Sequence, residues 1–423
     1  MVAVFFIALG IFLKIAHHKA MERNDIVSDA KKLQTELVEI RRDLHARAET
    51  GFDVGETLQY LEKQLLNLGY TPKRCGKAGL VASAGEKKGG KCFLLRADID
   101  GLPIQEKTGA SFACKRGNMH ACGHDLHAAM LLGAAKLLKQ REEQLCGEVR
   151  LLFQPAEEIL EGAKDVIDNG VLKGVDGAAM IHVLTDVEMP VGTLIVSNQV
   201  SAPAADFFTI TINGKGCHGS SPWNGIDALT AAAHILLALQ EIAARELSIA
   251  QPAVLTIGSL QTQPAGNVIS DKAVMKGTLR AFDEEVRKRV KERMEKIARQ
   301  VANAFRARVR ICYDGGCPTL VNDEKTAVFA HEQMQALLGK GKVFLSTAVG
   351  ERDKAKSGGS EDFAYIAQKV PSVMMALAAG ERKLGYGYPL HHPKTSFDEK
   401  ALYVGCAAYA QIAIAYLEKF ELS

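Results

Sequence analysis

Residues 120–127 read HACGHDLH and place three histidines, one cysteine and one aspartate within eight residues. Such a stretch can bind a metal ion, can activate Cys122 as a nucleophile, or can supply caps and buried hydrogen bonds at the start of a helix. Cys122 and His124 provide only two ligands, so a metal site needs others from elsewhere in the chain. The segment by itself leaves all three interpretations open.

The remaining candidate ligands follow short apolar runs. Glu157 and Glu158 come directly after EVRLLFQPA, His182 lies in AAMIHV, and His391 and His392 lie in YPLHHP. Two adjacent carboxylates are poorly stable as free anions in one dry pocket, so a metal ion would stabilise one and leave the other for proton transfer. Cysteine, histidine and glutamate together suit zinc, and carboxylate oxygens also admit manganese. Taken together, these residues favour a metal site.

The elements that must position these residues alternate between strands and helices. The pattern predicts strands at 91–97, 148–154 and 178–183, and helices at 24–46, 56–68 and 128–140. Helices between short apolar strands are typical of a parallel sheet, whose functional site lies at the carboxyl ends of the strands. The fold class that we predict is therefore α/β.

A different order of elements follows residue 200. The pattern predicts β-α-β-β-α-β, the ferredoxin-like order, over 206–212, 227–244, 253–260, 273–282, 284–304 and 308–313. Because α/β segments resume afterwards, we interpret this unit as an insertion. The expected domains are an N-terminal extension at 1–20, a catalytic domain in two parts at 21–202 and 315–423, and the inserted domain at 203–314.

Composition excludes several classes of protein. The chain has 423 residues, 47% of them hydrophobic and 24% charged, with a net charge of +3 and one tryptophan. That balance is typical of a globular protein and gives no indication of a nucleic-acid partner. The nine cysteines are scattered and odd in number. They indicate a reducing, cytoplasmic location rather than a disulfide framework.

The N-terminus begins with an apolar run at 2–13, VAVFFIALGIFL. It is shorter than the ~20 residues of a membrane span, and neither a basic region before it nor a cleavage site after it is evident. We favour a true start at Met21 or a dispensable extension. A weak, uncleaved membrane anchor is the alternative.

Long motifs run in one order through the chain from about Ile26 onward. They include RADIDGLPIQEKTG (96–109), MHACGHDLHAAMLLGAAKLL (119–138), FQPAEE (153–158), GKGCHGSSPWNGIDAL (214–229), GNVISDKAVMKGTLRAF (266–282), SEDFAYI (360–366) and LHHP (390–393). The chain thereby resembles the dinuclear metal amidohydrolases of the aminoacylase and carboxypeptidase superfamily. That group includes N-acyl-L-amino-acid amidohydrolases, hippurate hydrolases, N-acetyldiaminopimelate deacetylases and plant auxin-conjugate hydrolases.

The resemblance implies a zinc-peptidase-like catalytic α/β domain, an inserted lid that also forms a homodimer, and metal-dependent hydrolysis of N-acyl amino acids. It implies two divalent ions, zinc or manganese, with cobalt or nickel as alternatives. Glu157 matches the general base, and five residues match the ligands: Cys122, His124, Glu158, His182 and His391. The ligand in the family pattern directly follows the leucine, which favours His391 over His392.

Further roles follow from the resemblance for residues of the inserted domain. His218 matches a histidine that polarises the scissile carbonyl, often in the partner subunit's site, although it could simply cap a turn. Asn267 and Arg280 match residues that face the substrate, and an arginine suits a bidentate grip on a carboxylate. Turn stabilisation by Asn267 and a strand-surface ion pair by Arg280 are the alternatives.

Three acidic residues near the ligands have expected supporting roles. We expect Asp98 and Asp100 to orient ligands through hydrogen bonds rather than to bind metal. Asp125 would act similarly or cap the following helix. We interpret His127 as structural, and His45 as structural or superficial.

The chain departs from the family pattern at two places. His45 is followed by Ala48 and Glu49 where the family has proline and glutamate, and Thr395 with Ser396 follow LHHP where an aromatic residue and an acid are expected. These departures leave the substrate preference open. A diaminopimelate-pathway deacetylase, a dipeptidase or carboxypeptidase, a thiol hydrolase centred on Cys122 and a catalytically silent binding protein are the alternatives, although the complete ligand set argues against the last.

Overall fold

We describe the fold from a computed structural model that covers residues 26–86, 89–262, 265–346 and 359–419. The apolar run at 2–13 and the extension expected at 1–20 lie outside the described residues. The chain divides into two compact units. The first consists of the described residues within Met1–Gln199, Asn322–Ala355 and Ile366–Ser423, and the second of those within Val200–Val321 and Lys356–Tyr365.

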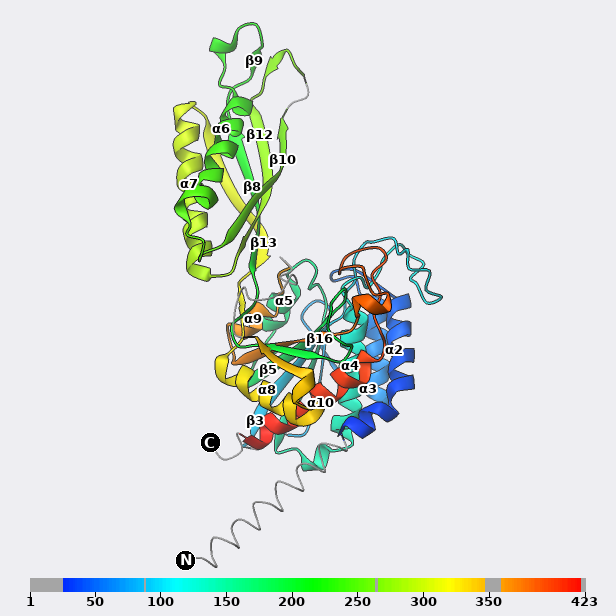
Figure 1. Cartoon of the computed structure of the whole chain (residues 1–423). Helices are drawn as coiled ribbons and strands as arrows, with labels where there is room; N and C mark the ends of the chain where they lie inside the picture. The colour runs from blue at the N-terminus through cyan, green and yellow to red at the C-terminus, as the bar shows by residue number, and fades with distance from the viewer. Residues whose placement is uncertain (1–25, 87–88, 263–264, 347–358, 420–423) are drawn as a thin grey trace, which may run out of the picture. The chain divides into compact units, whose positions relative to one another are not determined.

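The first unit is built on an eight-stranded sheet with the strand order β1-β2-β4-β3-β5-β16-β6-β15. Strands β3, β5 and β16 of this sheet are labelled in Figure 1. The central strands β4, β3, β5 and β16 are parallel, as the alternating pattern predicts. The strands are β1 (Lys73–Cys75), β2 (Gly79–Ala84), β3 (Lys91–Asp98), β4 (Gly147–Gln154), β5 (Gly177–Leu184), β6 (Leu194–Ser197), β15 (Val343–Ser346) and β16 (Ser372–Ala378).

Helices α4, α8 and α10 pack against this sheet, and α2 and α3 pack against α4. The helices are α2 (Gln34–Ala46), α3 (Gly55–Asn67), α4 (His124–Lys139), α5 (Gly162–Asp168), α8 (Glu324–Leu338), α9 (Ala364–Ala367) and α10 (Ala401–Lys419). The sequence places the start of α4 at residue 128, which is wrong. The helix begins four residues earlier, because Gly123 adopts a left-handed conformation with φ of 87° just before His124.

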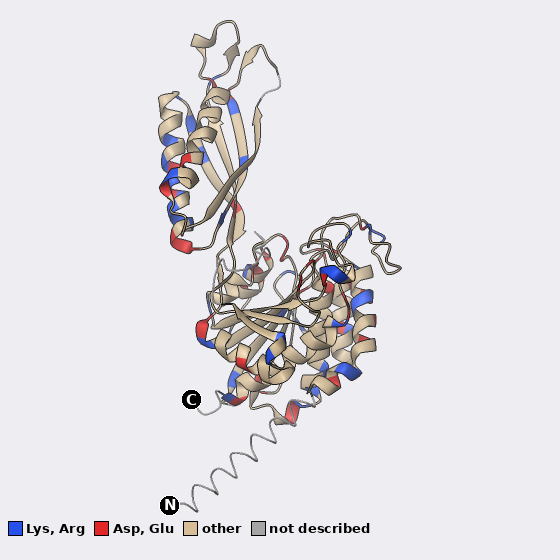
Figure 2. Cartoon of the chain, in the orientation of Figure 1, with Lys and Arg blue, Asp and Glu red and all other residues tan. Residues whose placement is uncertain are grey.

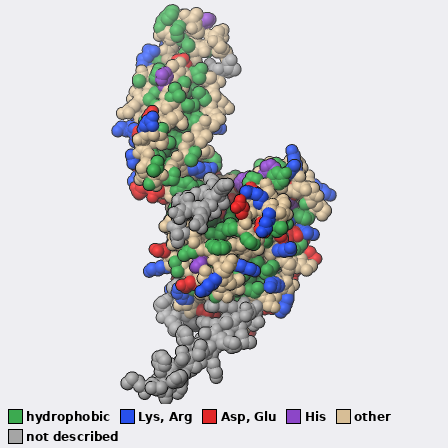
Figure 3. All heavy atoms as spheres, viewed as in Figure 1, with side chains coloured by type: hydrophobic (Ala, Val, Ile, Leu, Met, Phe, Trp, Pro, Cys, Tyr) green, Lys and Arg blue, Asp and Glu red, His purple; other side chains and the backbone are tan. Residues whose placement is uncertain are grey.

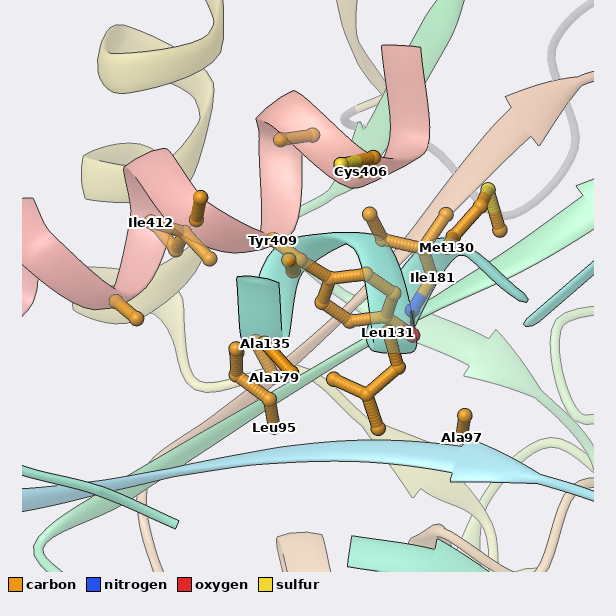
Figure 4. Packing of buried hydrophobic residues seen from close by; sticks show 14 of the residues in the cluster. Leu95, Ala97, Met130, Leu131, Ala135, Ala179, Ile181, Cys406, Tyr409 and Ile412 are labelled. Carbon is orange, nitrogen blue, oxygen red and sulfur yellow. Dashed lines mark hydrogen bonds between the residues drawn. The ribbon is translucent and has the colours of Figure 1, made fainter. Parts of the chain in front are cut away.

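Helix α10 is the apolar centre of the first unit. By length and composition it could cross a membrane, but 83% of the stretch concerned is buried inside the protein. Tyr409 of α10 packs among Met130 and Leu131 of α4 and Ile181 of β5 (Figure 4). The apolar character of α10 is therefore that of a core helix.

The hydroxyl of Tyr409 lies where the β3–β5 ladder ends. The last paired residues of that ladder are Arg96 and Met180. Beyond them, the Tyr409 hydroxyl accepts from the Ile181 N–H at 2.9 Å and donates to the Arg96 carbonyl at 2.8 Å. The side chain thus joins two strands where their own pairing stops, just before both strands reach the candidate site.

Replacing Tyr409 by phenylalanine should lower the free energy of unfolding by about 2 to 3 kcal/mol, because two buried backbone groups each lose a partner. Denaturant unfolding of the full chain measures the change. Tyr70→Phe is the control, since the Tyr70 hydroxyl serves a single backbone group, the Ala135 carbonyl; its loss should cost about 1 kcal/mol. Equal losses in the two variants would contradict the bridging role of Tyr409.

The second unit holds a four-stranded antiparallel sheet with the order β10-β12-β8-β13. Its principal elements follow one another as β8, α6, β10, β12, α7 and β13, and two short pairs, β9 with β11 and β7 with β14, accompany them. Their bounds are β7 (Val200–Ala202), β8 (Ala204–Asn213), β9 (Cys217–His218), α6 (Ala228–Glu241), β10 (Ala253–Thr262), β11 (Val268–Ile269), β12 (Lys272–Ala281), α7 (Glu284–Ala304), β13 (Arg308–Cys317) and β14 (Leu320–Val321).

Helices α6 and α7 cover one face of this sheet, where Phe208, Ile210 and Ile212 of β8 are buried between exposed or half-buried neighbours. Basic and acidic residues are mixed in the sequence of helix α7, and both colours mark its ribbon (Figure 2). Two of them reach the start of β8: Arg287 and Lys291 both bind the buried carboxylate of Asp206, at 2.7 and 2.9 Å. A buried carboxylate with two cationic partners fixes the helix on the sheet.

Candidate metal centre

Three neighbouring strands bring polar residues to one edge of the first unit's sheet. β3 ends at Asp98, which is paired with Gln154 at the end of β4. Glu157 and Glu158 follow Gln154 within a few residues, and His182 lies near the end of β5. Since carboxyl ends of parallel strands share an edge, these residues gather there as the sequence predicts.

The turn between Cys122 and His124 lies close against β5. A Cβ atom on Gly123 would be 2.4 Å from Cγ2 of Val183, so a larger residue there would have to displace the Val183 side chain. The same glycine places His124 in the first turn of α4. Gly123 thereby brings the cysteine and histidine of the CGH motif to the strand that carries His182.

All five predicted ligands and the predicted base come together within the first unit. Donor atoms that lie within 4.8 Å of one another form several groups, of which two share Cys122 and one holds both glutamates. These groups are Cys122–His124–His182, Cys122–Glu158–His391 and His124–Glu157–Glu158.

Individual distances show how closely the groups approach. The sulfur of Cys122 lies 3.5 Å from Nε2 of His182. Nε2 of His391 lies 3.5 Å from Oε2 of Glu158, and Nε2 of His124 lies 3.8 Å from one oxygen of each glutamate. Distances of this size leave room for ions between the donors, since zinc binds nitrogen, oxygen and sulfur at about 2.0 to 2.3 Å.

Hydrogen bonds at Nδ1 orient two of the histidines. Nδ1 of His124 lies 2.8 Å from the backbone carbonyl of Asp100, and Nδ1 of His182 lies 2.8 Å from that of Val183. A carbonyl only accepts, so each Nδ1 donates, and in the neutral ring each Nε2 then carries the lone pair that a metal requires. Nε2 of His124 is buried and has no hydrogen-bond partner among the residues that the structure describes. This donor set fits a metal ion.

The charges around the ligands favour a cation over a thiol nucleophile. Burial raises the pKa of the Cys122 thiol well above its ordinary value, and the charge of Glu158 raises it further. Burial lowers the pKa of His124, but the charge of Asp98 and the contact with Asp100 outweigh it and raise that pKa. A thiol in this environment is a poor nucleophile alone, whereas the same negative surroundings stabilise a cation that holds the thiolate.

Asp98 hydrogen-bonds to His127 and Arg96, which are not predicted ligands. Its Oδ1 accepts from Nδ1 of His127 at 2.5 Å and its Oδ2 accepts from Arg96 at 2.7 Å, while Oδ2 remains 3.7 Å from Nε2 of His124. The Val183 N–H donates to Nε2 of His127 at 2.9 Å, so His127 is the neutral, Nδ1-protonated tautomer. Asp98 and His127 thus hold the residue that follows His182. Asp98, His124 and His127 also form a further group with metal-binding spacing.

Asp100 and Asp125 differ in what they hold. Asp100 accepts from the N–H groups of Glu157 and Glu158 at 3.1 and 3.3 Å, in addition to orienting His124 through its carbonyl. Asp125 does not cap α4, which has Gly123 as its N-cap and no side-chain cap. The capping alternative is wrong, because the Asp125 carboxylate binds Arg41 and His45 of α2 instead; its role in orienting ligands stays a prediction.

Backbone strain accompanies two of the ligand-bearing turns. Ala156, just before the glutamates, has φ of 60°, and His391 has φ of 64°. Left-handed conformations are uncommon for residues other than glycine, and such residues are frequent at functional sites. The N–H of His391 binds the Ala121 carbonyl at 3.0 Å, which ties this turn to the residue before Cys122. His392 lies elsewhere, stacked on Tyr388 with ring centroids 4.6 Å apart.

The second unit carries the other three predicted residues. His218 is exposed on β9, and its Nδ1 accepts from the Ser220 N–H at 3.1 Å, which leaves Nε2 as the protonated nitrogen. Asn267 is exposed, and its backbone carbonyl accepts from the Gly219 N–H at 2.7 Å. Arg280 is half-buried on β12, with its guanidinium carbon 5.5 Å from the ring centroid of Phe207.

Comparisons with known proteins identify the class. Residues 94–415 match peptidase family M20/M25/M40. Since this match spans well over half of the chain, the protein belongs to that family. Its sequence is 37% identical over 396 residues to N-acetylcysteine deacetylase of Bacillus subtilis, covering 92% of this chain and 99% of that protein.

Two further relatives show how widely the family extends. Thermostable carboxypeptidase 1 of Saccharolobus solfataricus is 34% identical over 399 residues, covering 93% of this chain and 98% of that protein. The crystal structure of the Bacillus subtilis YXEP protein, described as a dinuclear metal-binding peptidase of the M20 family, is similar with a TM-score of 0.76 and 34% identity. That likeness covers 92% of this chain and 99% of the YXEP chain.

Proposed function

We propose that this protein is a metal-dependent amidohydrolase that cleaves the amide bond of N-acyl amino acids and releases a carboxylic acid and a free amino acid. The observation that carries the proposal is the overlap of the donor groups of Cys122, His124, Glu158, His182 and His391, with the second carboxylate, that of Glu157, beside His124 and Glu158. The similarity to an N-acetylcysteine deacetylase supports the substrate class.

We propose that these five side chains hold two divalent ions, zinc or manganese, with cobalt or nickel as alternatives. Two of the ligand groups share Cys122, which suits a thiolate placed between two ions. Bound there, the ions would polarise the scissile carbonyl and acidify a water molecule. The relative described as dinuclear supports the number of ions.

Glu157 is the proposed general base. Its side chain is 6% exposed, its backbone N–H donates to Asp100, and its Oε2 lies 3.8 Å from Nε2 of His124. Glu157 takes the proton of the attacking water and then delivers a proton to the leaving nitrogen. Because Glu158 is a ligand in this scheme, the two adjacent carboxylates have separate tasks.

The proposal extends to the second unit, which we infer to be a lid and homodimerisation domain. His218 would donate its Nε2 proton to the oxygen of the scissile carbonyl, as the family resemblance implies. In the family, the matching histidine often acts in the site of the partner subunit. Asn267 and Arg280 would bind the substrate, with the guanidinium on its carboxylate. The free cysteines of the chain support a cytoplasmic location.

A carboxypeptidase or dipeptidase is the second candidate function, favoured by the relatedness to a thermostable carboxypeptidase.

On the face shown in Figure 3, acidic and basic side chains are interspersed over the first unit, which is consistent with a small-molecule substrate rather than a nucleic acid.

The proposal predicts amino-acid release from N-acetyl, N-benzoyl or indole-acetyl amino acids. The assay uses protein stripped with a chelator and refilled with zinc or manganese, with dipeptides tested in parallel. We expect release to return only with metal. Release from dipeptides alone would favour the peptidase, and alkylation-sensitive release that ignores chelators would indicate a thiol hydrolase at Cys122.

A further inference from the structure

Helix α2 supplies none of the predicted metal ligands, yet it buries charge beside them. Arg41 is 4% exposed and His45 is 2% exposed, and both lie on the helix that also buries Leu37, Ile40 and Leu44. Burying charged groups costs free energy unless partners compensate them, and apolar residues would pack there at lower cost. The partners of these charges therefore indicate what the helix does.

The first partner is Asp125, the residue that follows His124 in the first turn of α4. Its Oδ2 accepts from Nε of Arg41 at 2.7 Å and from Nδ1 of His45 at 2.8 Å. The Asp125 side chain is fully buried. Two hydrogen bonds to one carboxylate oxygen restrict rotation of the helical turn that carries His124.

The second partner is Glu106, in the segment that leads from β3 to Cys122. Its Oε2 lies 3.0 Å from Nε2 of His45. Both ring nitrogens of His45 therefore face carboxylate oxygens, and His45 must be the doubly protonated imidazolium to donate to both. Burial lowers the pKa of His45, but the charge of Asp125 and the two hydrogen bonds outweigh it and raise that pKa.

The third partner is Glu399, in the segment between His391 and α10. Arg41 reaches its Oε1 at 3.1 Å, and Arg42 binds both of its oxygens at 2.9 and 2.8 Å. The Glu399 carbonyl also accepts from the Gln34 side chain at 2.9 Å. One helix thus holds three segments that are distant in the sequence.

We propose that α2 is a positioning element for the metal centre: Arg41, Arg42 and His45 hold in place the three segments that carry Cys122, His124 and His391. The three cations face three carboxylates, one on each segment, so the cluster balances in charge. These hydrogen bonds fix direction as well as distance, which apolar packing of α2 alone does not. The inference rests on the proposed metal centre.

The test measures metal affinity of the full chain apart from its activity. Chelator-stripped protein is titrated with cobalt or zinc against a chromophoric competitor, for wild type and for His45→Gln, which keeps the size of the side chain but lacks its charge and one donor. We expect roughly 10- to 100-fold weaker binding in the variant, the range found when groups supporting metal ligands are lost. The thiolate-to-cobalt absorption band reports separately on Cys122.

Asp29→Asn is the matched control. Asp29 pairs with Arg141 at 2.6 Å, and Arg141 lies two residues beyond the C-terminal end of α4; Asp29 also pairs with Lys32 at 2.8 Å. This variant also removes ion pairs of the helical residues 26–32, but it acts at the end of α4 opposite His124. Its metal affinity should equal that of the wild type.

Two outcomes overturn the inference without touching the proposed function. If His45→Gln loses stability in denaturant but binds metal with wild-type affinity, α2 is a purely structural helix. Arg42→Gln guards against a variant that does not fold, since Arg42 is half-exposed and its ion-pair partner is Glu399, although its guanidinium carbon also lies 5.0 Å from the ring centroid of Phe112. Its expected effect is weaker binding of one ion, and unchanged binding of both contradicts the inference. Failure of the wild type to bind two ions would instead defeat the metal centre itself.

Discussion

Replacing Glu157 by glutamine should lower kcat by about 100- to 10,000-fold, the contribution usual for a positioned general base, while two metal ions stay bound. Glutamine keeps the shape of the side chain and its backbone contact with Asp100, but it cannot take a proton from water. The five proposed ligands are untouched by the change. Turnover and metal content of the same purified protein are the two measurements.

Glu161→Gln is the control for this variant. Glu161 lies at the end of the same turn and is exposed, so the same chemical change there should leave both folding stability and kcat close to those of the wild type. A near-normal rate for Glu157→Gln would assign the base elsewhere. If Glu157→Gln loses a metal ion, Glu157 is a metal ligand instead of the base.

Much of the candidate site could be predicted because its residues follow strands. Short apolar runs indicate buried parallel strands, and parallel strands bring whatever follows them to one edge. Asp98, Glu157 and His182 therefore meet although they are far apart in the chain. Periodicity placed the start of α4 too late, since it detects a helix only where apolar side chains repeat, whereas Gly123 starts the helix at a histidine and an aspartate.

The contacts of α2 could not be predicted in the same way. Arg41, Arg42 and His45 follow one another in RRDLH, where charges usually indicate a solvated helix face. Their partners Glu106, Asp125 and Glu399 have no local relation to them in the sequence. The sequence predicts that His45 is structural or lies on the surface; in the structure it is buried between two carboxylates. Only the packing of α2 against α4 reveals that pattern.

His391→Asn should weaken binding of one metal ion and lower kcat/KM by at least about 100-fold, a loss beyond that expected for groups that merely support ligands. Nε2 of His391 faces Glu158 at 3.5 Å, in a group that also contains Cys122. Asparagine is chosen because it tolerates the left-handed conformation of this position, φ of 64°, better than alanine does. The change therefore removes the imidazole without adding backbone strain. Metal titration and the amidohydrolase assay measure it.

His392→Asn is the matched variant, the same substitution one residue further along. The His392 ring stacks on Tyr388, with 12° between the ring planes, and its Nδ1 accepts from the Lys394 N–H at 3.1 Å. Such a ring stabilises its own loop, so the variant should keep both ions and most of its activity. The two histidines are adjacent, and each is replaced by asparagine in its own variant. General damage to the loop would therefore affect both variants alike. If only His392→Asn loses metal, His392 is the ligand and His391 is not. If neither variant loses metal, this loop does not belong to the metal centre.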